Sequence, residues 1–188
     1  MRQENIKLKA LKNQVVVITG ASSGIGLATA IMAAKRGAKV VISSRNKEDL
    51  DIIARDLRNE GAQVFAVEAD VSKLEDMENL RDQAMQQFGC IDTWVNNAGV
   101  SIYGKLLEIP YEEERQIFET NFWGIRHGCR VAVRAMERSG GAIINLGSEV
   151  SEVAIPQQGM YSATKHAVKA YTDVLRMDMD RMQFPISV

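Results

Sequence analysis

The sequence predicts an α/β protein in which a doubly wound parallel sheet lies between two layers of helices. Short apolar runs rich in Val and Ile, typical of parallel strands buried on both faces, recur along the chain. Helical stretches separate these runs, and repeated strand–helix–strand units form right-handed crossovers and a three-layer structure. The length of 188 residues, without repeats or linkers, indicates a single domain over residues 1–188.

Three strand–helix units are expected in the first half of the chain. Asn46 is expected to cap the second helix, and Ser72 with Glu75 to form a capping box that opens the third. Each helix is expected to end at a glycine, the residue most common just after a helix: Gly37, Gly61 or Gly89. The expected strands are 15–18, 39–43 and 64–67, and the expected helices are 24–36, 47–59 and 73–88.

The second half continues the alternation with longer helices. Strands are expected at 91–95 and 142–146, one long helix at 111–138, and another helix beginning near Gly159. Residues 185–188 resemble the start of a sixth strand. We therefore expect a chain that stops inside this strand, so that the C-terminal end of the fold is missing.

Composition and charge exclude several classes of function. The net charge of −1 gives no electrostatic reason to expect nucleic acid or an anionic membrane as a partner. Cys90 and Cys129 show no metal-binding or CxxC spacing, and His127 and His166 have no partners at metal-ligand spacing. No leader peptide or membrane span is visible, so we expect a cytoplasmic protein without a metal site.

The polar clusters of the sequence follow the expected strands. In an open parallel sheet, ligands bind beyond the carboxyl ends of the strands. The segments that follow strands are 20–26, Ser44 with Arg45, Asp70, 96–99 and Ser148. The alternating pattern therefore places all of these clusters at one edge of the sheet.

The first of these clusters is a glycine-rich turn between a strand and a helix. Glycine lets the backbone approach a pyrophosphate, and a helix N-terminus offers free amides and a favourable dipole. The residues expected to bind a nucleotide here are Gly20, Ser22, Ser23, Gly24, Ile25 and Gly26. Their spacing differs from the GxGxxG of the best-known dinucleotide fingerprint.

Tyr161 and Lys165 are four residues apart in an expected helix and therefore share one face. An ammonium one turn away stabilises a phenolate, which makes the phenol usable for proton transfer. Ser148, at the mouth of the preceding strand, is placed to direct its hydroxyl to the same point. The three side chains together predict a site for proton transfer.

These motifs resemble the short-chain dehydrogenase/reductase family in its single-domain branch. Residues 19–26 match TGxxxGxG, 96–99 match NNAG, and Tyr161 with Lys165 match YxxxK; Asn121 and Ser148 stand where the family has an asparagine and a serine. The resemblance implies a Rossmann fold and a nicotinamide-dependent oxidoreductase that interconverts a carbonyl compound and an alcohol. It adds Asp70, Val71, Asn97, Ala98 and Gly99 to the cofactor-binding residues, together with Tyr161 and Lys165.

The resemblance also implies a role for each catalytic residue. Tyr161 is the acid when a carbonyl is reduced and the base when an alcohol is oxidised. Ser148 hydrogen-bonds the reacting oxygen, Lys165 binds the nicotinamide ribose, and Asn121 holds a water that relays protons to the lysine. Without the resemblance, Asn121 is a helix residue that bonds a neighbouring carbonyl, Asn96 and Asn97 shape a turn, and Asp70 caps a strand end.

The end of the second strand predicts NADP(H) rather than NAD(H), with NAD(H) still possible. Enzymes that select NAD usually have an acid here, whereas this chain has Ser44 and Arg45 and no acid before Glu48. A guanidinium suits the 2′-phosphate of NADP, and Ser22 offers a further hydroxyl. The alternative is that Arg45 is a solvated loop residue that stacks on adenine, which leaves the preference weak.

Two further questions concern partners and activity. The helices at 111–138 and after 159 have more apolar positions than one face of the sheet covers. In the family this helix pair commonly forms a dimer interface. A homodimer or homotetramer is therefore expected. The positions are Ile117, Phe118, Ile125, Val131, Val133, Ala167, Val168 and Tyr171. The substrate is not specified, because the family's substrate-binding segment follows the sixth strand. The alternative function is a catalytically silent nucleotide-binding module with a regulatory or scaffolding role.

Overall fold

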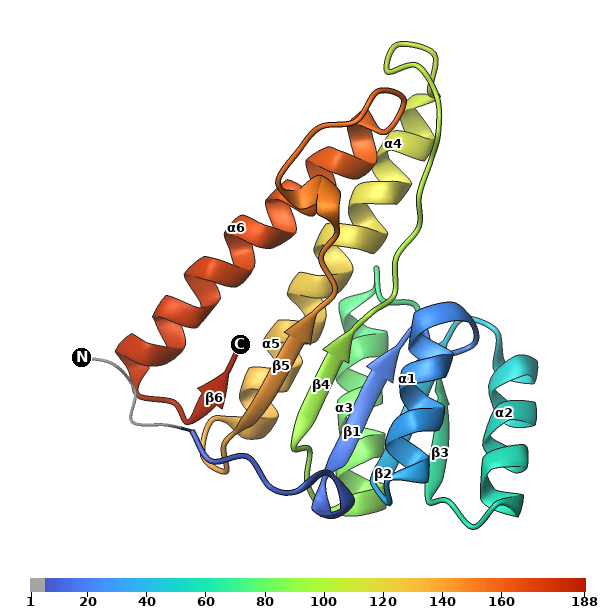
Figure 1. Ribbon diagram of the computed structural model, residues 1–188, viewed down its shortest axis with the longest axis vertical. Coiled ribbons are helices and arrows are strands. Elements are labelled where there is room, and N and C mark those ends of the chain that lie inside the picture. Colours follow the sequence, from blue (N-terminus) through green and yellow to red (C-terminus); the bar gives the residue numbers. More distant parts are fainter. Residues whose placement is uncertain (1–5) are drawn as a thin grey trace.

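The structure is a computed structural model that describes residues 6–188. The first five residues of the expected domain lie outside the described part, and the expected absence of a leader peptide rests partly on them. Six parallel strands form one sheet in the order β3-β2-β1-β4-β5-β6 (Figure 1). This confirms the doubly wound sheet, because the chain winds outward in one direction from β1 and in the other from β4. The strands are β1 (Val15–Thr19), β2 (Lys39–Ser44), β3 (Val64–Glu68), β4 (Thr93–Asn96), β5 (Gly141–Asn145) and β6 (Ile186–Ser187).

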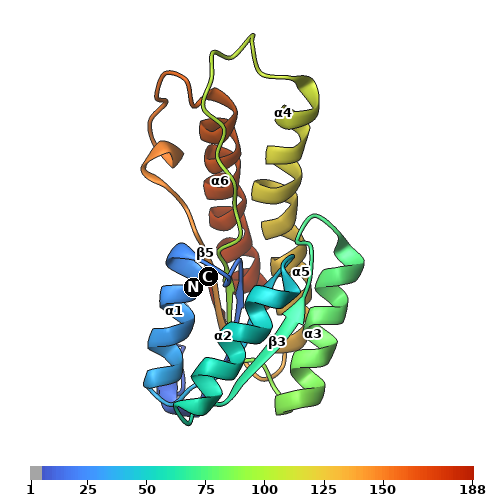
Figure 2. The same ribbon diagram turned by 90° about the vertical axis from the view of Figure 1, so that its right-hand side faces the viewer.

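Helices cover both faces of the sheet, as Figures 1 and 2 show. One face is covered by α1 (Gly24–Lys35) and α2 (Lys47–Asn59), and the other by α3 (Leu74–Phe88), α5 (Gly124–Met136) and α6 (Gly159–Met182). Alternate residues of β1 point into the two resulting cores, with Val16 and Ile18 on the α1 side and Val15 and Val17 on the other. This explains why the strand is apolar throughout.

Most of the expected helix ends are confirmed, but the capping box at Ser72 is wrong. Asn46 accepts a hydrogen bond from the backbone nitrogen of Asp49 at 3.2 Å, as expected for an N-cap. By contrast, α3 begins at Leu74 with Lys73 as its N-cap, and no side chain caps it. The hydroxyl of Ser72 donates instead to Oδ1 of Asp70 at 2.8 Å. A capping serine accepts a hydrogen bond from a backbone amide. Here the hydroxyl is oriented by donating to a carboxylate, and such a charge-assisted bond is stronger than a neutral one.

The long helix expected at 111–138 is interrupted. It consists of α4 (Tyr111–Phe118), a π-helical turn at Glu119–Trp123 and α5. A π turn widens the helix by one residue and is frequent at functional sites. Here it contains the buried Asn121, whose side chain bonds outside the helix to Val100 and Thr164.

Above the carboxyl ends of β4 and β5, α4 and α6 extend beyond the sheet (Figure 1). Two loops rise beside them, residues 97–110 and residues 146–158 (Figure 2). The second loop contains a short 3-10 helix, η3 (Glu149–Ser151). At the sheet edge, β6 pairs with β5 at only two register positions. Within residues 6–188, no helix has the length and apolar character needed to cross a membrane.

Candidate functional site

A cavity of about 760 Å³ opens at the carboxyl ends of the strands, where the winding direction reverses. Its volume suits a bound small molecule or cofactor. It brings together nearly all of the predicted site residues: Gly20, Ser22, Ser23, Gly24, Ile25, Ser44, Arg45, Asp70, Val71, Asn97, Ala98, Gly99, Ser148, Tyr161 and Lys165. Gly26 and Asn121 do not line the cavity. Its wall also contains residues that were not predicted: Asn46, Ala69, Val100, Ser101, Thr120, Leu146 and Gly147.

The turn between β1 and α1 forms a cradle for an anion. Gly24 has a φ of +55°, and a Cβ placed on it would meet no atom within 4 Å. Ser23 is the N-cap of α1, yet its side chain accepts no bond from the first turn. The first amides of α1 are therefore not satisfied by a cap, and with the helix dipole they favour a phosphate. The residues present fit the pyrophosphate of a dinucleotide.

Gly20 and Gly26 serve the packing of this turn. A Cβ on Gly26 would overlap the carbonyl oxygen of Gly20 and the side-chain amide of Asn97. A Cβ on Gly20 would lie 2.7 Å from the Cα of Ala98. The two glycines therefore permit α1 to approach the end of β4, and Gly26 acts behind the cavity wall.

The two asparagines of the segment 96–99 hold neighbouring strands together. Asn97 donates from Nδ2 to the carbonyl oxygens of Thr19, at 2.9 Å, and Gly20, at 3.1 Å. Asn96 accepts from the indole of Trp94 at 2.8 Å and donates to Oδ1 of Asn145 at 2.8 Å. Both side chains thus brace the structure, which agrees with the turn-shaping alternative; Asn97 lines the cavity as well.

The end of β2 presents an unpaired cation to the cavity. Arg45 is exposed, lines the cavity, and has no ion pair or hydrogen-bond partner within residues 6–188. Ser44 beside it accepts from the backbone nitrogen of Asn46 at 3.2 Å. In the segment after the neighbouring strand, Asp70 accepts from both the nitrogen and the hydroxyl of Ser72, so its carboxylate is bonded within its own turn. Of these residues, Arg45 alone supplies a positive charge to a ligand.

Lys165 and Tyr161 lie on one wall of the cavity, one helical turn apart. The ammonium of Lys165 is buried, donates to the carbonyl oxygen of Leu146 at 2.7 Å, and is 5.7 Å from the ring centre of Tyr161. Burial lowers the pKa of Lys165 below its ordinary value of 10.5, because desolvation disfavours the charged form. The bond to Leu146 fixes the lysine between β5 and α6.

Ser148 stands at the end of the segment that leaves β5. It is the N-cap of η3: its Oγ accepts from the nitrogen of Val150 at 3.4 Å, and its own nitrogen donates to Oγ of Ser151 at 3.1 Å. Within the described residues the Ser148 hydroxyl donates no hydrogen bond. Its proton is therefore free for an oxygen atom placed in the cavity.

Asn121 lies behind this wall. Its Oδ1 accepts from the nitrogen of Val100 at 2.8 Å, and its Nδ2 donates to the carbonyl oxygen of Val100 at 2.8 Å and to Oγ1 of Thr164 at 3.2 Å. Both amide hydrogens are thereby used. The side chain makes the contact to a neighbouring carbonyl that the alternative interpretation expects, and the water-holding role remains a prediction.

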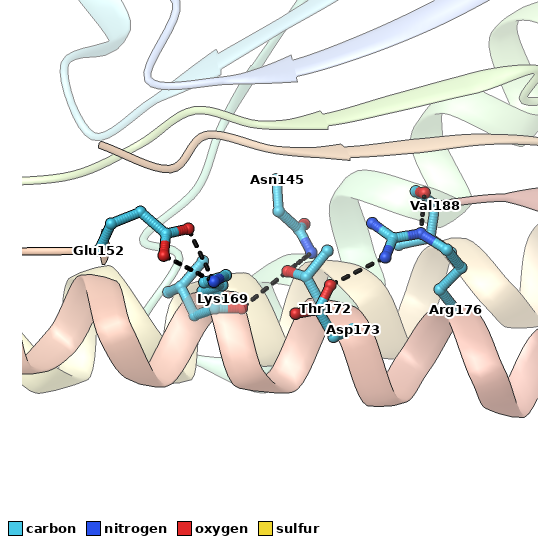
Figure 3. A network of polar contacts seen from close by, with 8 residues as sticks. Asn145, Glu152, Lys169, Thr172, Asp173, Arg176 and Val188 are labelled. Atoms are coloured by element: carbon cyan, nitrogen blue, oxygen red, sulfur yellow. Dashed lines mark hydrogen bonds and ion pairs between the residues drawn. The ribbon is translucent and has the colours of Figure 1, made fainter. Parts of the chain in front are cut away.

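Further along α6, a polar network fixes this helix against β5 and the loop after it (Figure 3). Asn145, the last residue of β5, donates to Oγ1 of Thr172 at 2.9 Å. Lys169 pairs with Glu152 at 2.7 Å, and Arg176 bridges Asp173 and the carbonyl oxygen of Val188. The network therefore sets the position of the helix that carries Tyr161 and Lys165 relative to Ser148.

The histidines have structural partners. Nδ1 of His127 lies 3.1 Å from the carbonyl oxygen of Val71, and Nδ1 of His166 lies 2.9 Å from that of Ser162. In the described part of the chain, no three His, Cys, Asp or Glu side chains are grouped so that they could hold a metal ion.

Comparison with known proteins agrees with this geometry. The sequence profile of the short chain dehydrogenases matches residues 14–188. The uncharacterized oxidoreductase YxnA of Bacillus subtilis is 45% identical over 185 residues, which are 97% of this chain and 52% of YxnA. The chain thus spans about half the length of that relative.

Two solved structures have the same fold. The short chain dehydrogenase/reductase from Burkholderia phymatum in complex with NAD has a TM-score of 0.92 at 33% identity, with 96% of this chain and 65% of that one covered. The alcohol dehydrogenase from the archaeon Thermococcus sibiricus complexed with 5-hydroxy-NADP has a TM-score of 0.85 at 34% identity, covering 88% and 71%. The chain therefore belongs to the short-chain dehydrogenase family.

Proposed function

We propose that the chain forms the catalytic part of an NADP(H)-dependent oxidoreductase that transfers a hydride between the nicotinamide and a carbonyl or secondary alcohol substrate. The observation that carries this proposal is that Ser148, Tyr161 and Lys165 line the same cavity as the glycine-rich turn. A catalytically silent nucleotide-binding module needs only the turn. It gives no reason for these three side chains to converge.

Each of the three side chains has one task in this proposal. When bound, the nicotinamide supplies the hydride to a carbonyl carbon or accepts it from an alcohol. Tyr161 gives its phenolic proton to the carbonyl oxygen, or takes the proton of the alcohol in the reverse direction. The ammonium of Lys165 stabilises the negative charge on the phenol oxygen, and Ser148 donates a hydrogen bond to the reacting oxygen.

The preference for NADP(H) rests on Arg45. Its unpaired guanidinium faces the cavity beside Ser44, with Ser22 across the turn, and the nearest following acid is Glu48, inside α2. A bidentate pair with a 2′-phosphate fits this arrangement. Since the two related structures hold NAD in one case and 5-hydroxy-NADP in the other, fold alone does not select the cofactor.

The cofactor proposal is tested by titrating NADPH and NADH at fixed ionic strength into the parent and into Arg45→Ala. NADPH is expected to bind the parent more tightly, and the substitution is expected to weaken NADPH selectively by about tenfold, as for the loss of one charge-assisted hydrogen bond. Equal affinities in the parent contradict the preference and leave hydride transfer untouched.

The catalytic proposal is tested by NADPH oxidation with a panel of ketones and aldehydes, on the full-length gene product. Tyr161→Phe is expected to abolish turnover with nearly unchanged cofactor affinity, because it removes the proton and little else. Lys165→Ala is expected to lower both turnover and cofactor affinity. A phenylalanine variant that turns over at the parent rate would show that the tyrosine is not the acid.

We also propose a homodimer or homotetramer that acts in the cytoplasm. One argument for assembly is corrected: of the eight apolar helix positions, Ile117, Ile125, Val131 and Val168 are buried in the chain's own core. Trp123, Val174 and Met177 on the same helices remain exposed and support an interface. Light scattering that gives a monomer at micromolar concentration contradicts the assembly.

The cytoplasmic location is supported by the unpaired thiols of Cys90 and Cys129, which suit a reducing compartment.

A further inference from the structure

Six large apolar side chains are exposed above the cavity, five on the two loops and one at the start of α4, and we call them the apolar rim. They belong to the segments around 97–110 and 146–158 and include the most exposed large apolar residue of the described chain, Leu107, at 97%. Tyr103 is 70% exposed. The full set is Tyr103, Leu106, Leu107, Tyr111, Val153 and Ile155. Exposed apolar residues gathered in this way mark a binding surface more often than scattered ones.

The two loops form one surface because they are joined at their tips. The nitrogen of Gly104 donates to the carbonyl oxygen of Gln157 at 3.0 Å. Leu106 lies against the start of α6, where a Cβ on Gly159 would overlap its side chain. Gly159 is two residues before Tyr161, so the rim is anchored to the helix that carries the candidate acid. The parallel course of the two loops is visible in Figure 2.

The rim continues into the wall of the cavity. The first loop contributes Val100 and Ser101 to the lining, and the second contributes Gly147 and Ser148. Each loop therefore runs from the reacting centre to the rim without interruption. A substrate whose carbonyl group reaches Ser148 and Tyr161 therefore places the rest of its carbon skeleton along these loops.

The charges of the same segments exclude an anionic substrate body. Residues 97–110 and 146–159 contain a single cation, Lys105, which pairs with Glu108 at 2.9 Å. Glu152 pairs with Lys169 at 2.7 Å, and Glu149 is exposed. The described loops thus carry one carboxylate outside these ion pairs, Glu149, and no unpaired cation. A carboxylate or phosphate on the substrate would be repelled there and would lack a partner.

From the apolar rim and its charges, and on the basis of the proposed function, we infer that the substrate is an uncharged ketone or secondary alcohol with an extended apolar body, which lies on the rim. Burial of this body contributes to the stability of the complex in proportion to its apolar area. The rim therefore selects for size and against negative charge.

Three ketones that share a methyl ketone end test this inference: 2-butanone, 2-octanone and 7-oxooctanoate. The last two have equal length and differ only by a carboxylate at the far end. With NADPH and the full-length gene product, kcat/KM is expected to be at least about tenfold higher for 2-octanone than for 2-butanone, because several more methylenes are buried. The value for 7-oxooctanoate is expected to lie about tenfold or more below that for 2-octanone.

Two substitutions of Leu107 connect these differences to the rim. Leu107→Ser is expected to reduce the advantage of 2-octanone over 2-butanone by about threefold or more, since it removes apolar contact area. Leu107→Lys supplies the missing cation and is expected to raise kcat/KM for 7-oxooctanoate relative to 2-octanone. Ile52→Ser, at a residue of similar chemistry that is 48% exposed on α2, is the matched control and leaves the ratios unchanged.

The outcomes separate the two proposals. If all three ketones are reduced with similar kcat/KM, the proposed function holds and the inference about the substrate is overturned. If none is reduced, both fail. If Leu107→Ser changes the oligomeric state in sedimentation and leaves the ratios as in the parent, the rim is an interface between copies of the chain, which also overturns the inference.

Discussion

Replacement of Asn121 by alanine distinguishes a bracing side chain from one that acts directly on the reaction. Asn121 is fully buried in the π-helical turn and connects Val100, in the cavity wall, with Thr164 on α6. Alanine removes all three hydrogen bonds and leaves the backbone nitrogen and oxygen of Val100 without these partners. We therefore expect the main effect on stability.

The size of the effect follows from the contacts. A net contribution of about 1 kcal/mol for each of the three hydrogen bonds, with part of the loss recovered by cavity water, predicts a decrease of about 2–3 kcal/mol in the free energy of unfolding. For a chain of this length, the melting temperature should fall by roughly 4–12 °C. Urea unfolding followed by circular dichroism measures the first quantity, and calorimetry the second.

Asn121→Asp provides the matched comparison, because it has the same shape. The carboxylate still accepts from the nitrogen of Val100 but places an oxygen against the carbonyl of Val100 and buries a charge. At neutral pH this variant should be less stable than Asn121→Ala. This difference in stability should shrink as the pH falls, since burial raises the pKa of a carboxyl group and the protonated group can donate to the carbonyl of Val100 again.

The reasoning is refuted if Asn121→Ala unfolds within about 0.5 kcal/mol of the parent, the range of a neutral surface substitution, and yet loses turnover. The side chain would then act on the reaction itself, as a water-holding residue does. Loss of stability with turnover retained at low temperature supports the bracing role.

Three further predictions concern other parts of the site. Gly26→Ala should weaken cofactor binding at least about tenfold and destabilise the fold by about 1–3 kcal/mol, because the new Cβ overlaps the Gly20 carbonyl. The control is Ala28→Gly, which costs α1 about 1 kcal/mol and should leave cofactor affinity unchanged. Titration with NADPH compares the two variants. Burial raises the pKa of the Cys129 thiol to about 12, so Ellman's reagent at about pH 8 should label Cys129 only after unfolding; labelling of both thiols in the native protein contradicts this. Thr172→Val should lower the free energy of unfolding by about 1–2 kcal/mol by removing the acceptor of Asn145, whereas Thr172→Ser should not, and urea titrations of the pair decide.

The sequence predicts the sheet because its strands are buried on both faces. Val16 and Val17 point into different cores, and each needs an apolar neighbour, so the run has no alternation and is recognisable as a parallel strand. The positions of the polar clusters then follow from topology alone. Gly24, Arg45 and Ser148, far apart in sequence, line one cavity because each follows a strand of the same sheet.

The features that sequence reasoning missed are those decided by tertiary contacts. The π-helical turn depends on the bonds of Asn121 to Val100 and Thr164, which a helical pattern does not contain. Ser72 is a local exception: its hydroxyl donates to Asp70 two residues earlier instead of accepting from an amide of α3, and a capping pattern does not distinguish these two bonds. Leu146 was missed although it follows Asn145 directly, because it binds Lys165 through its backbone oxygen and not its side chain.

The decisive measurement is a crystal structure of the full-length gene product with NADP(H) bound. We expect the 2′-phosphate at Arg45, the pyrophosphate at the N-terminus of α1, and the nicotinamide beside Tyr161 and Lys165. A dinucleotide bound outside this cavity, or bound with its nicotinamide directed away from Tyr161, would contradict the proposed hydride transfer.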